Sequence, residues 1–271
     1  MALLEVDDVV VKFGGVTAVN RATFTADSGQ ITGLIGPNGA GKTTCFNVIT
    51  GLQKPTSGRV RYRDRDVTRW PVHKRAKHGI GRTFQRLEAF GSLTVRDNVR
   101  VARDIRGGPL AWARTAVPAA RATSKGNLEI DILLDRVGIR EYADERADAI
   151  PTGTARLLEL ARALACDPHL LLLDEPSSGL DETETDAFGE LLKDLARQGV
   201  AILMVEHDMD LVMAVCDDIH VLDFGQIIAS GPPAAIRNDP AVQRAYLGYA
   251  DGDDHTAELD LTAIVEPEVQ S

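Results

Sequence analysis

Residues 31–48, ITGLIGPNGAGKTTCFNV, decide the fold of this chain. An apolar run at residues 31–35 leads into a glycine-rich turn, and a helical pattern follows from Lys42. The turn satisfies the template G-x-x-x-x-G-K-[ST], and a strand before it and a helix after it are the context that this motif requires. A glycine-rich structural turn with a chance lysine is the alternative, and nine consecutive matching residues in this setting make it remote. The sequence therefore predicts a strand, a phosphate-binding loop and a helix in direct succession.

The residue types in this loop are those that hold a phosphate chain. Glycines let the backbone approach an anion and turn its N–H groups inward. The helix N-terminus adds about half a positive charge, Lys42 adds a full charge for the β- and γ-phosphates, and the Thr43 hydroxyl is suited to Mg²⁺. The predicted nucleotide-binding residues of the loop are Gly36, Pro37, Asn38, Gly39, Ala40, Gly41, Lys42, Thr43 and Thr44.

Length and composition indicate a globular protein. The chain has 271 residues, of which 44% are hydrophobic and 26% are charged, so it can form one large or two small domains with a full core. Its apolar runs are shorter than the ~18 residues of a membrane span, and the start of the chain carries acids where a secretory signal has basic residues. We therefore expect a cytosolic protein unless a partner holds it elsewhere. Three scattered cysteines favour small core residues over disulfides or a zinc site.

The charge is unevenly distributed. The net charge is −10, but seven acids and no Lys or Arg lie in residues 251–271, and without them the chain carries only −3. The pattern predicts a disordered acidic tail over residues 250–271. Residues 59–86 have the opposite bias, with ten Lys or Arg against two acids. A solvated strand-and-turn face is the favoured interpretation, attraction to anionic lipid is the second, and nucleic-acid binding is disfavoured because few aromatic residues accompany the charges.

The first third of the chain predicts a small sheet around the loop. Short β-branched runs and glycine turns over residues 3–33 indicate a mostly antiparallel sheet that leads into the phosphate loop. Phe13, just before two glycines, is either a core residue or an aromatic that stacks on a base, and spacing leaves both open. The stretch HGIGRTFQ ends a helix and starts a strand with Gln85 at its exit, which alone is weak evidence for function.

Residues 91–147 change to helical spacing. Apolar residues recur at Val95, Val99 and Ala102, and the same spacing returns at residues 130–137. Between them lies a stretch rich in Ala, Arg, Gly and Pro, at residues 106–126, whose role the composition does not decide. We expect a helical subdomain with an irregular insertion.

Two apolar strands then deliver polar residues to one edge. LLLLDEP is the pattern of a strand buried on both faces, with Asp174 and Glu175 at its end. A second strand, VAILMVEH, ends at Glu206 and His207. Ligands bind at the carboxyl ends of strands in open α/β sheets, so these side chains are candidate site residues. A terminal hairpin (HVLDFGQIIASG) and a final helical segment are expected before the tail.

Five elements in this order resemble the nucleotide-binding subunit of an ATP-binding cassette (ABC) transporter. They are GPNGAGKTT, Gln85, a glycine-containing helix start at residues 151–156, LLLLDEP and His207. The resemblance covers residues 4–249 and implies an α/β fold, that of a P-loop NTPase of ABC type. This fold has a RecA-like core, an N-terminal antiparallel β subdomain and a helical subdomain at about residues 91–160. It implies one ABC ATPase domain over residues 1–249.

The resemblance also implies roles for single residues. Lys42 and Thr43 would hold the phosphates of ATP and Mg²⁺, and Asp174 would support the Mg²⁺ shell. Glu175 would orient or activate the attacking water, and His207 would touch the γ-phosphate. Gln85 would link the metal and the water to the membrane partner, and Phe13 would stack on adenine. A further loop of the family, between two subunits, matches Ser178, Gly179, Leu180 and Asp181. Phosphoryl transfer needs mainly positioning and charge neutralisation, which such a set can supply.

One motif departs from the family pattern. Residues 150–154, IPTGT, stand where the family has LSGGQ, and only Gly153 is retained. Proline has neither a hydroxyl nor an N–H to offer the γ-phosphate of the other subunit's nucleotide. Thr152 and Thr154 are the candidate replacements, and Gly153 and Thr154 are retained as expected nucleotide contacts.

Several stretches are most similar to the subunits that energise uptake of branched-chain amino acids. These are HGIGRTFQ, EHDMDLVMAVCDDIHVLDFGQIIASG and the ending IRNDPAVQRAYLG. Importers of urea or short amides, and a lipopolysaccharide exporter, are the alternatives within the family. A non-transport cassette ATPase and a GTPase are disfavoured, because a second cassette, a long inserted arm and an N-K-x-D motif are absent from the sequence.

The implied partners are integral-membrane permease subunits, a second ABC ATPase in a heterodimer, and a substrate-binding protein. The implied location is the inner face of the cell membrane.

Overall fold

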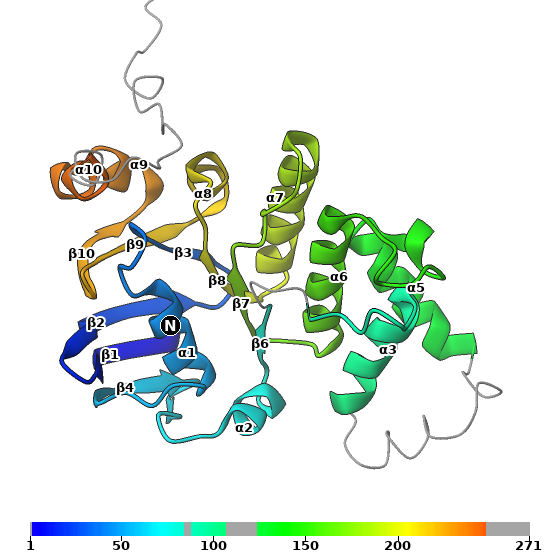
Figure 1. The fold of residues 1–271 in the computed structure, drawn as a ribbon, viewed down its shortest axis with the longest axis horizontal. Coiled ribbons are helices and arrows are strands. Elements are labelled where there is room, and N and C mark those ends of the chain that lie inside the picture. Colours follow the sequence, from blue (N-terminus) through cyan, green and yellow to red (C-terminus); the bar gives the residue numbers. More distant parts are fainter. Residues whose placement is uncertain (1, 84–87, 107–123, 248–271) are drawn as a thin grey trace, which may run out of the picture.

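The computed structural model describes residues 2–83, 88–106 and 124–247 (Figure 1). Gln85, most of the insertion at residues 106–126 and the acidic tail therefore lie outside the described residues. Within the described ranges, no helix is both long enough and apolar enough to span a membrane.

An antiparallel sheet forms the N-terminal part of the fold. Its strands run in the order β2-β1-β4-β5. Their bounds are β1 Ala2–Phe13, β2 Val16–Asp27, β4 Ser57–Tyr62 and β5 Arg65–Asp66. Residues 31–33, which the sequence suggested as part of this sheet, instead belong to a second sheet. The difference follows from burial: every residue of that segment is buried, as in a strand covered on both faces.

The second sheet has the order β10-β9-β3-β8-β7-β6. Its strands are β3 Ile31–Ile35, β6 Ile80–Arg82, β7 Leu170–Asp174, β8 Ala201–Val205, β9 Asp218–Asp223 and β10 Gln226–Gly231. All neighbours pair in parallel except β9 and β10, which form the expected terminal hairpin. The carboxyl ends of β3, β7 and β8 therefore lie at one edge of the sheet.

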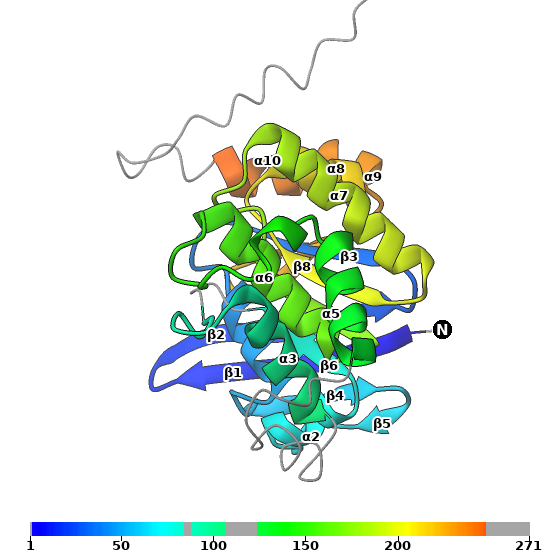
Figure 2. The same cartoon turned by 90° about the vertical axis from the view of Figure 1, so that its right-hand side faces the viewer.

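Helices of the described residues lie around the two sheets (Figure 2). They are α1 Lys42–Thr50, α2 Val72–Lys77, α3 Val95–Arg106, α5 Ser124–Arg136, α6 Thr152–Ala165, α7 Glu182–Arg197, α8 Met209–Val215, α9 Pro233–Arg237 and α10 Pro240–Leu247, with a 3₁₀ turn η1 at Arg140–Tyr142. In Figure 1, α1 lies beside the antiparallel sheet, whereas α3, α5 and α6 form a separate group on the far side of β7.

Alternate residues of the buried strands feed two different cores. On β7, Leu170 and Leu172 pack with α1 and the antiparallel sheet, and Leu171 and Leu173 pack with α6, α7 and α8. Side chains of a strand point to opposite faces in turn, so a continuous leucine run can serve both cores. Cys45 and Cys216 are buried core residues, as expected, and Cys166 is half-buried.

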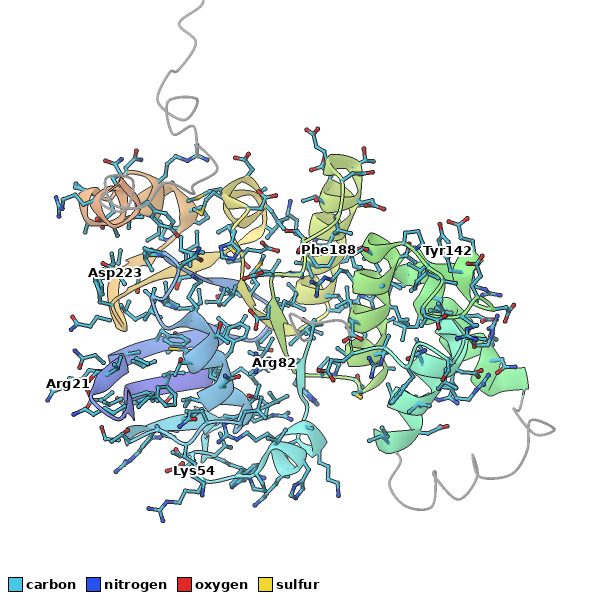
Figure 3. All side chains as sticks on the ribbon, in the orientation of Figure 1. Arg21, Lys54, Arg82, Tyr142, Phe188 and Asp223 are labelled. Carbon is cyan, nitrogen blue, oxygen red and sulfur yellow. The ribbon has the colours of Figure 1, made fainter. Side chains whose placement is uncertain are left out.

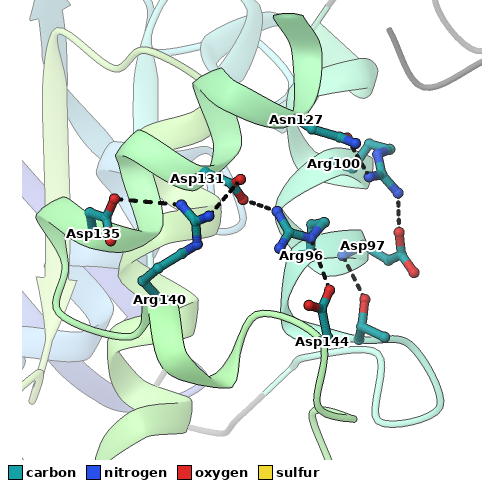
Figure 4. Close-up of polar contacts among 9 residues, drawn as sticks. Arg96, Asp97, Arg100, Asn127, Asp131, Asp135, Arg140 and Asp144 are labelled. Atoms are coloured by element: carbon teal, nitrogen blue, oxygen red, sulfur yellow. Dashed lines mark hydrogen bonds and ion pairs between the residues drawn. The ribbon is translucent and has the colours of Figure 1, made fainter. Parts of the chain in front are cut away.

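Ion pairs join α3, α5 and η1 (Figure 4). Arg96 of α3 pairs with Asp131 of α5 and lies 3.1 Å from Asp144. Arg140 of η1 reaches the same Asp131 at 2.9 Å. Because Asp131 is shared by two arginines, it links both η1 and α3 to α5.

The basic stretch at residues 59–86 is only partly a solvated face. Most of its described basic residues are exposed, but Arg75 is 1% exposed and only 10% of the Arg82 side chain is exposed. The Arg75 guanidinium donates to the carbonyls of Val48 and Ile49, in the last turn of α1. The Val48 carbonyl also accepts from the N–H of Gly51 at the end of the helix, so the guanidinium adds a second donor there and supplies one to Ile49. Burial lowers the pKa of Arg75 to about 10.

His220 on β9 ties the two sheets together. Its Nε2 lies 3.1 Å from the carbonyl of Thr25 on β2, and its Nδ1 lies 2.8 Å from the hydroxyl of Ser230 on β10. A carbonyl can only accept, so Nε2 carries the hydrogen, and Nδ1 of the neutral ring accepts from Ser230. Burial lowers the pKa of His220 below its ordinary value of 6.5, although the Thr25 carbonyl and Asp218 act in the opposite direction.

We therefore expect His220 to make the fold sensitive to acid. The unfolded chain takes up a proton near pH 6.5, whereas folded His220 takes it up only at lower pH. The free energy of unfolding should thus fall as the pH drops below that value. Urea unfolding of the wild type and of His220→Gln at about pH 7.5 and about pH 5.5 measures this contribution, because glutamine does not titrate. An equal loss of stability in both proteins would contradict it.

Candidate functional site

The phosphate loop lies between β3 and α1, and its glycines are required by close backbone contacts. A Cβ on Gly36, whose φ is +147°, would lie 1.9 Å from the carbonyl oxygen of Leu222 on β9. A Cβ on Gly41, with φ +108°, would lie 2.4 Å from the carbonyl oxygen of Ala18 on β2. Gly39, with φ +80°, faces open space. The loop is therefore pressed against two strands on one side and open on the other.

Lys42 lies beneath the loop. Its ammonium donates to the carbonyls of Gly36 at 2.6 Å and Pro37 at 2.9 Å, and the residue is only 7% exposed. Burial lowers the pKa of Lys42, and the nearby charges of Glu175 and Asp174 act in the opposite direction. A phosphate chain in the loop would add negative charge and so favour the ammonium further. The predicted lysine and both predicted carboxylates are therefore electrostatically coupled.

The C-terminal part of the chain supports the loop from behind. The N–H of Gly225, in the β9–β10 turn, donates to Ala40, and its carbonyl accepts from Asn20 of β2. Tyr246 of α10 is hydrogen-bonded to the backbone of Gly36, and burial raises the pKa of its phenol to about 12. The sequence analysis did not assign these roles, since a tyrosine 210 positions after the loop gives no local signal.

Asp174 and Glu175 emerge at the end of β7, as expected. Asp174 is 3% exposed and pairs with Arg82 at the end of β6, with 3.0 Å between Nη2 and Oδ2. Glu175 has a φ of +50°, and its N–H donates to Val205, the last residue of β8. Its Oε1 lies 2.6 Å from Nε2 of His207. The structure thus brings together the predicted water-orienting carboxylate and the predicted histidine.

Glu206 organises the two loops that carry these groups. It is 4% exposed, and its carboxylate accepts from the N–H of Ser177 at 2.7 Å and of His207 at 2.9 Å. One buried side chain therefore joins the segment after β7 to the segment after β8. The sequence placed Glu206 at this edge but gave no reason to assign it this role.

Other predicted site residues lie around the same loop. Thr43 is exposed, and Thr44 is half-buried. Phe13 is 51% exposed at the end of β1, in the hairpin whose second strand brings Ala18 against Gly41. The exposed position does not fit the core alternative.

The degenerate signature at residues 150–154 packs on the loop before α7. A Cβ on Gly153 would lie 3.2 Å from the carbonyl oxygen of Gly179, and a Cβ on Gly179 would lie 3.3 Å from Thr152. Asp181 accepts from the N–H of Glu184 and caps α7. Gly153 and Thr154 are buried, whereas Thr152 is exposed. Of the two candidate replacements for the family serine, only Thr152 is at the surface.

These groups are suited to a magnesium nucleotide. The loop offers backbone N–H groups and one buried ammonium, and its open side at Gly39 leaves room for a ligand. Mg²⁺ takes oxygen ligands and is commonly held by one or two carboxylates together with substrate phosphates. The Thr43 hydroxyl and the Asp174 carboxylate are such oxygens. Among the described residues, no cluster of three or more His, Cys, Asp or Glu could hold a metal without help from a ligand.

A family model described as ABC transporter matches residues 19–178, from β2 to just beyond Glu175. This range covers more than half of the chain. The chain belongs to the ABC transporter ATP-binding family. The expected fold class and the expected ATPase activity are thereby confirmed. A second model, described as branched-chain amino acid ATP-binding cassette transporter, matches residues 226–252. Its range includes β10 and Tyr246, which contacts the phosphate loop.

Individual members of the ABC family match along nearly their whole length. The high-affinity branched-chain amino acid transport ATP-binding protein LivG of Salmonella typhimurium is 40% identical over 92% of this chain and 98% of its own. The corresponding protein BraF of Pseudomonas aeruginosa is 39% identical over the same shares. A crystal structure of a nucleotide-free ATP-binding cassette from an ABC transporter superposes with a TM-score of 0.80 at 29% identity, covering 91% of this chain and 99% of that one.

Glu206→Gln should destabilise the site of this ABC subunit. Glutamine has one carbonyl oxygen, whereas the carboxylate uses Oε1 for the partly buried N–H of Ser177 and Oε2 for that of His207, so one of these two donors loses its acceptor. An unsatisfied buried donor costs about 1–3 kcal/mol of unfolding free energy, and we expect a loss toward the lower end because these donors are only partly buried. Urea unfolding measures the loss, with the exposed Glu141→Gln as a control. Equal unfolding midpoints in the two variants would show that Glu206 does not hold the loops.

Proposed function

We propose that this chain binds and hydrolyses MgATP to energise the import of branched-chain amino acids. The single observation that carries the ATPase site is the contact of 2.6 Å between Glu175 and His207, beside the loop that buries Lys42. The substrate class rests on the model match at residues 226–252 and on the names of LivG and BraF. These findings favour it over an importer of urea or amides, a lipopolysaccharide exporter or a non-transport ATPase.

The surroundings of the described site residues support a role for each. The loop N–H groups and Lys42 would bind the phosphates, with Thr43 and Asp174 as oxygen donors toward Mg²⁺. Bound Mg²⁺ would neutralise charge on the phosphates. Glu175 would orient the attacking water, with His207 at hydrogen-bond distance able to hold that carboxylate or contact the γ-phosphate. Phe13 would stack on adenine, and Gln85 remains the proposed link to the permease.

We further propose the organisation that the family resemblance suggests. Residues 1–249 would form one ABC ATPase domain, with a helical subdomain at about residues 91–160 and an acidic tail after it. The chain would lie on the inner face of the membrane, bound to integral-membrane permease subunits. A substrate-binding protein would deliver the amino acid to the wider complex.

The site assignment is tested by two variants in the assembled transporter. Glu175→Gln keeps the shape of the side chain but removes its charge, so it should bind ATP and lose about 10²- to 10³-fold in turnover. Lys42→Ala should weaken nucleotide binding itself, because it removes the charge that faces the phosphates. Nucleotide affinity and phosphate release are measured separately for each. Wild-type turnover in both variants would refute the assignment.

The signature segment leads to a prediction about assembly. A composite site takes its phosphate loop from one subunit and its signature from the other, so a homodimer would place the degenerate segment over both nucleotides. We propose a heterodimer, in which the partner's signature completes the site at Lys42 and Glu175. Glu175→Gln in this chain should then reduce ATPase activity more than the equivalent change in the partner. The opposite order, or full turnover by this chain alone, would indicate that Thr152 is an adequate replacement.

A further inference from the structure

Arg82 joins three elements of the nucleotide site through one guanidinium. It lies at the end of β6, near the centre of the molecule (Figure 3). Its Nη2 is 3.0 Å from Oδ2 of Asp174, and its Nη1 is 2.7 Å from Oδ1 of Asn47 on α1. The guanidinium carbon also lies 5.8 Å from the ring centre of Phe46. Contacts on two edges and one face leave this side chain little freedom to change its position.

The pair with Asp174 sets the direction of a carboxylate that has little room. The Arg82 and Asp174 side chains are 10% and 3% exposed, so water does not replace the contact easily. A carboxylate has two oxygens, and engagement of Oδ2 determines where Oδ1 points. Asp174 is also the carboxylate proposed above to support Mg²⁺. The contact with Arg82 therefore fixes the orientation in which the Asp174 carboxylate would be presented to Mg²⁺.

The second contact connects this carboxylate to the phosphate-binding helix. Asn47 lies on α1, the helix that begins at Lys42 and Thr43. Through Asn47 and Asp174, Arg82 links the strand that ends at one proposed metal-supporting residue to the helix that carries the other. Two donors of a rigid fork are needed to reach both partners at once, and a lysine has no such fork.

We propose that Arg82 is a positioning residue for magnesium, which holds Asp174 at a fixed place relative to Thr43 on α1. The inference rests on the proposed metal roles of Thr43 and Asp174 and extends them. Partners that orient a metal-supporting side chain typically change metal affinity by about 10- to 100-fold when they are removed. An alternative role for Arg82 predicts the opposite change in Mg²⁺ affinity. If Arg82 acted mainly as a cation that competes with Mg²⁺ for Asp174, its removal would tighten Mg²⁺ binding.

The experiment measures how Mg²⁺ and a fluorescent ATP analogue bind together to the full-length chain. Affinity for the analogue is determined in EDTA and then across a Mg²⁺ titration. Arg82→Gln should leave the affinity in EDTA within about twofold of wild type, because the phosphate loop and Lys42 are intact, and should raise the Mg²⁺ concentration at half effect about tenfold. Arg82→Lys should give an intermediate shift, since it keeps the charge but reaches only one partner.

Two further variants make the result specific. Asn47→Ala keeps the ion pair but removes the link to α1, so it should raise the Mg²⁺ requirement in the same direction by a smaller factor. Arg63→Gln, at an exposed arginine after β4, is the matched control and should change nothing. If Arg82→Gln fails to fold, as thermal unfolding would reveal, Asn47→Ala alone decides.

The outcomes separate this inference from the function proposed above. An unchanged or lowered Mg²⁺ requirement in Arg82→Gln overturns the positioning role, and so does an unchanged requirement in Asn47→Ala. A wrong assignment of the nucleotide site would be seen in a different variant. Lys42→Ala would then bind the analogue in EDTA as tightly as wild type does. A Mg²⁺ requirement raised in Arg82→Gln and in Asn47→Ala, with affinity in EDTA retained, supports the proposal.

Discussion

The burial of one ammonium beneath the glycine loop is the constraint on which the site depends. Lys42 is held by two carbonyls of its own loop and is removed from water, so its charge must be stabilised by the surrounding structure. The strands β3, β7 and β8 meet this need because parallel pairing brings their carboxyl ends, and therefore Asp174 and Glu175, to the same edge. The sheet order is thus directly connected to the electrostatics of the loop.

Elements with a strong local pattern were predictable from the sequence. The phosphate loop, the buried leucine strand β7 and the terminal hairpin each carry their information in consecutive residues. Arg75 and Arg82 were not predictable in this way, because they lie in a run of exposed arginines and differ from them only in distant partners: the carbonyls of α1 and the carboxylate of Asp174. The role of Glu206 was missed for the same reason. Its partners are backbone N–H groups, one of which lies 29 positions earlier in the chain.

The signature segment at residues 150–154 shows a second limit of prediction from sequence. Gly153 is the one residue that matches the family pattern, and its contact with Gly179 explains why a side chain would crowd this position. Whether Thr152 or Thr154 is exposed could not be derived from their identities. Exposure depends on how the first turn of α6 faces the loop before α7. That is a property of packing between residues 26 and 27 positions apart in the chain.

The Arg75 contact has a consequence for the dynamics of α1. Helix ends normally fray, because their last carbonyls lack partners, and amide hydrogens there exchange quickly with solvent. In this chain a buried guanidinium from α2 occupies the carbonyls of Val48 and Ile49, while the other end of the helix is fixed by the loop around Lys42. A nine-residue helix that would be marginal alone is thereby clamped at both ends. A displacement of α2 would therefore be transmitted along α1 to the phosphate loop as a rigid shift, without unwinding of the helix between them.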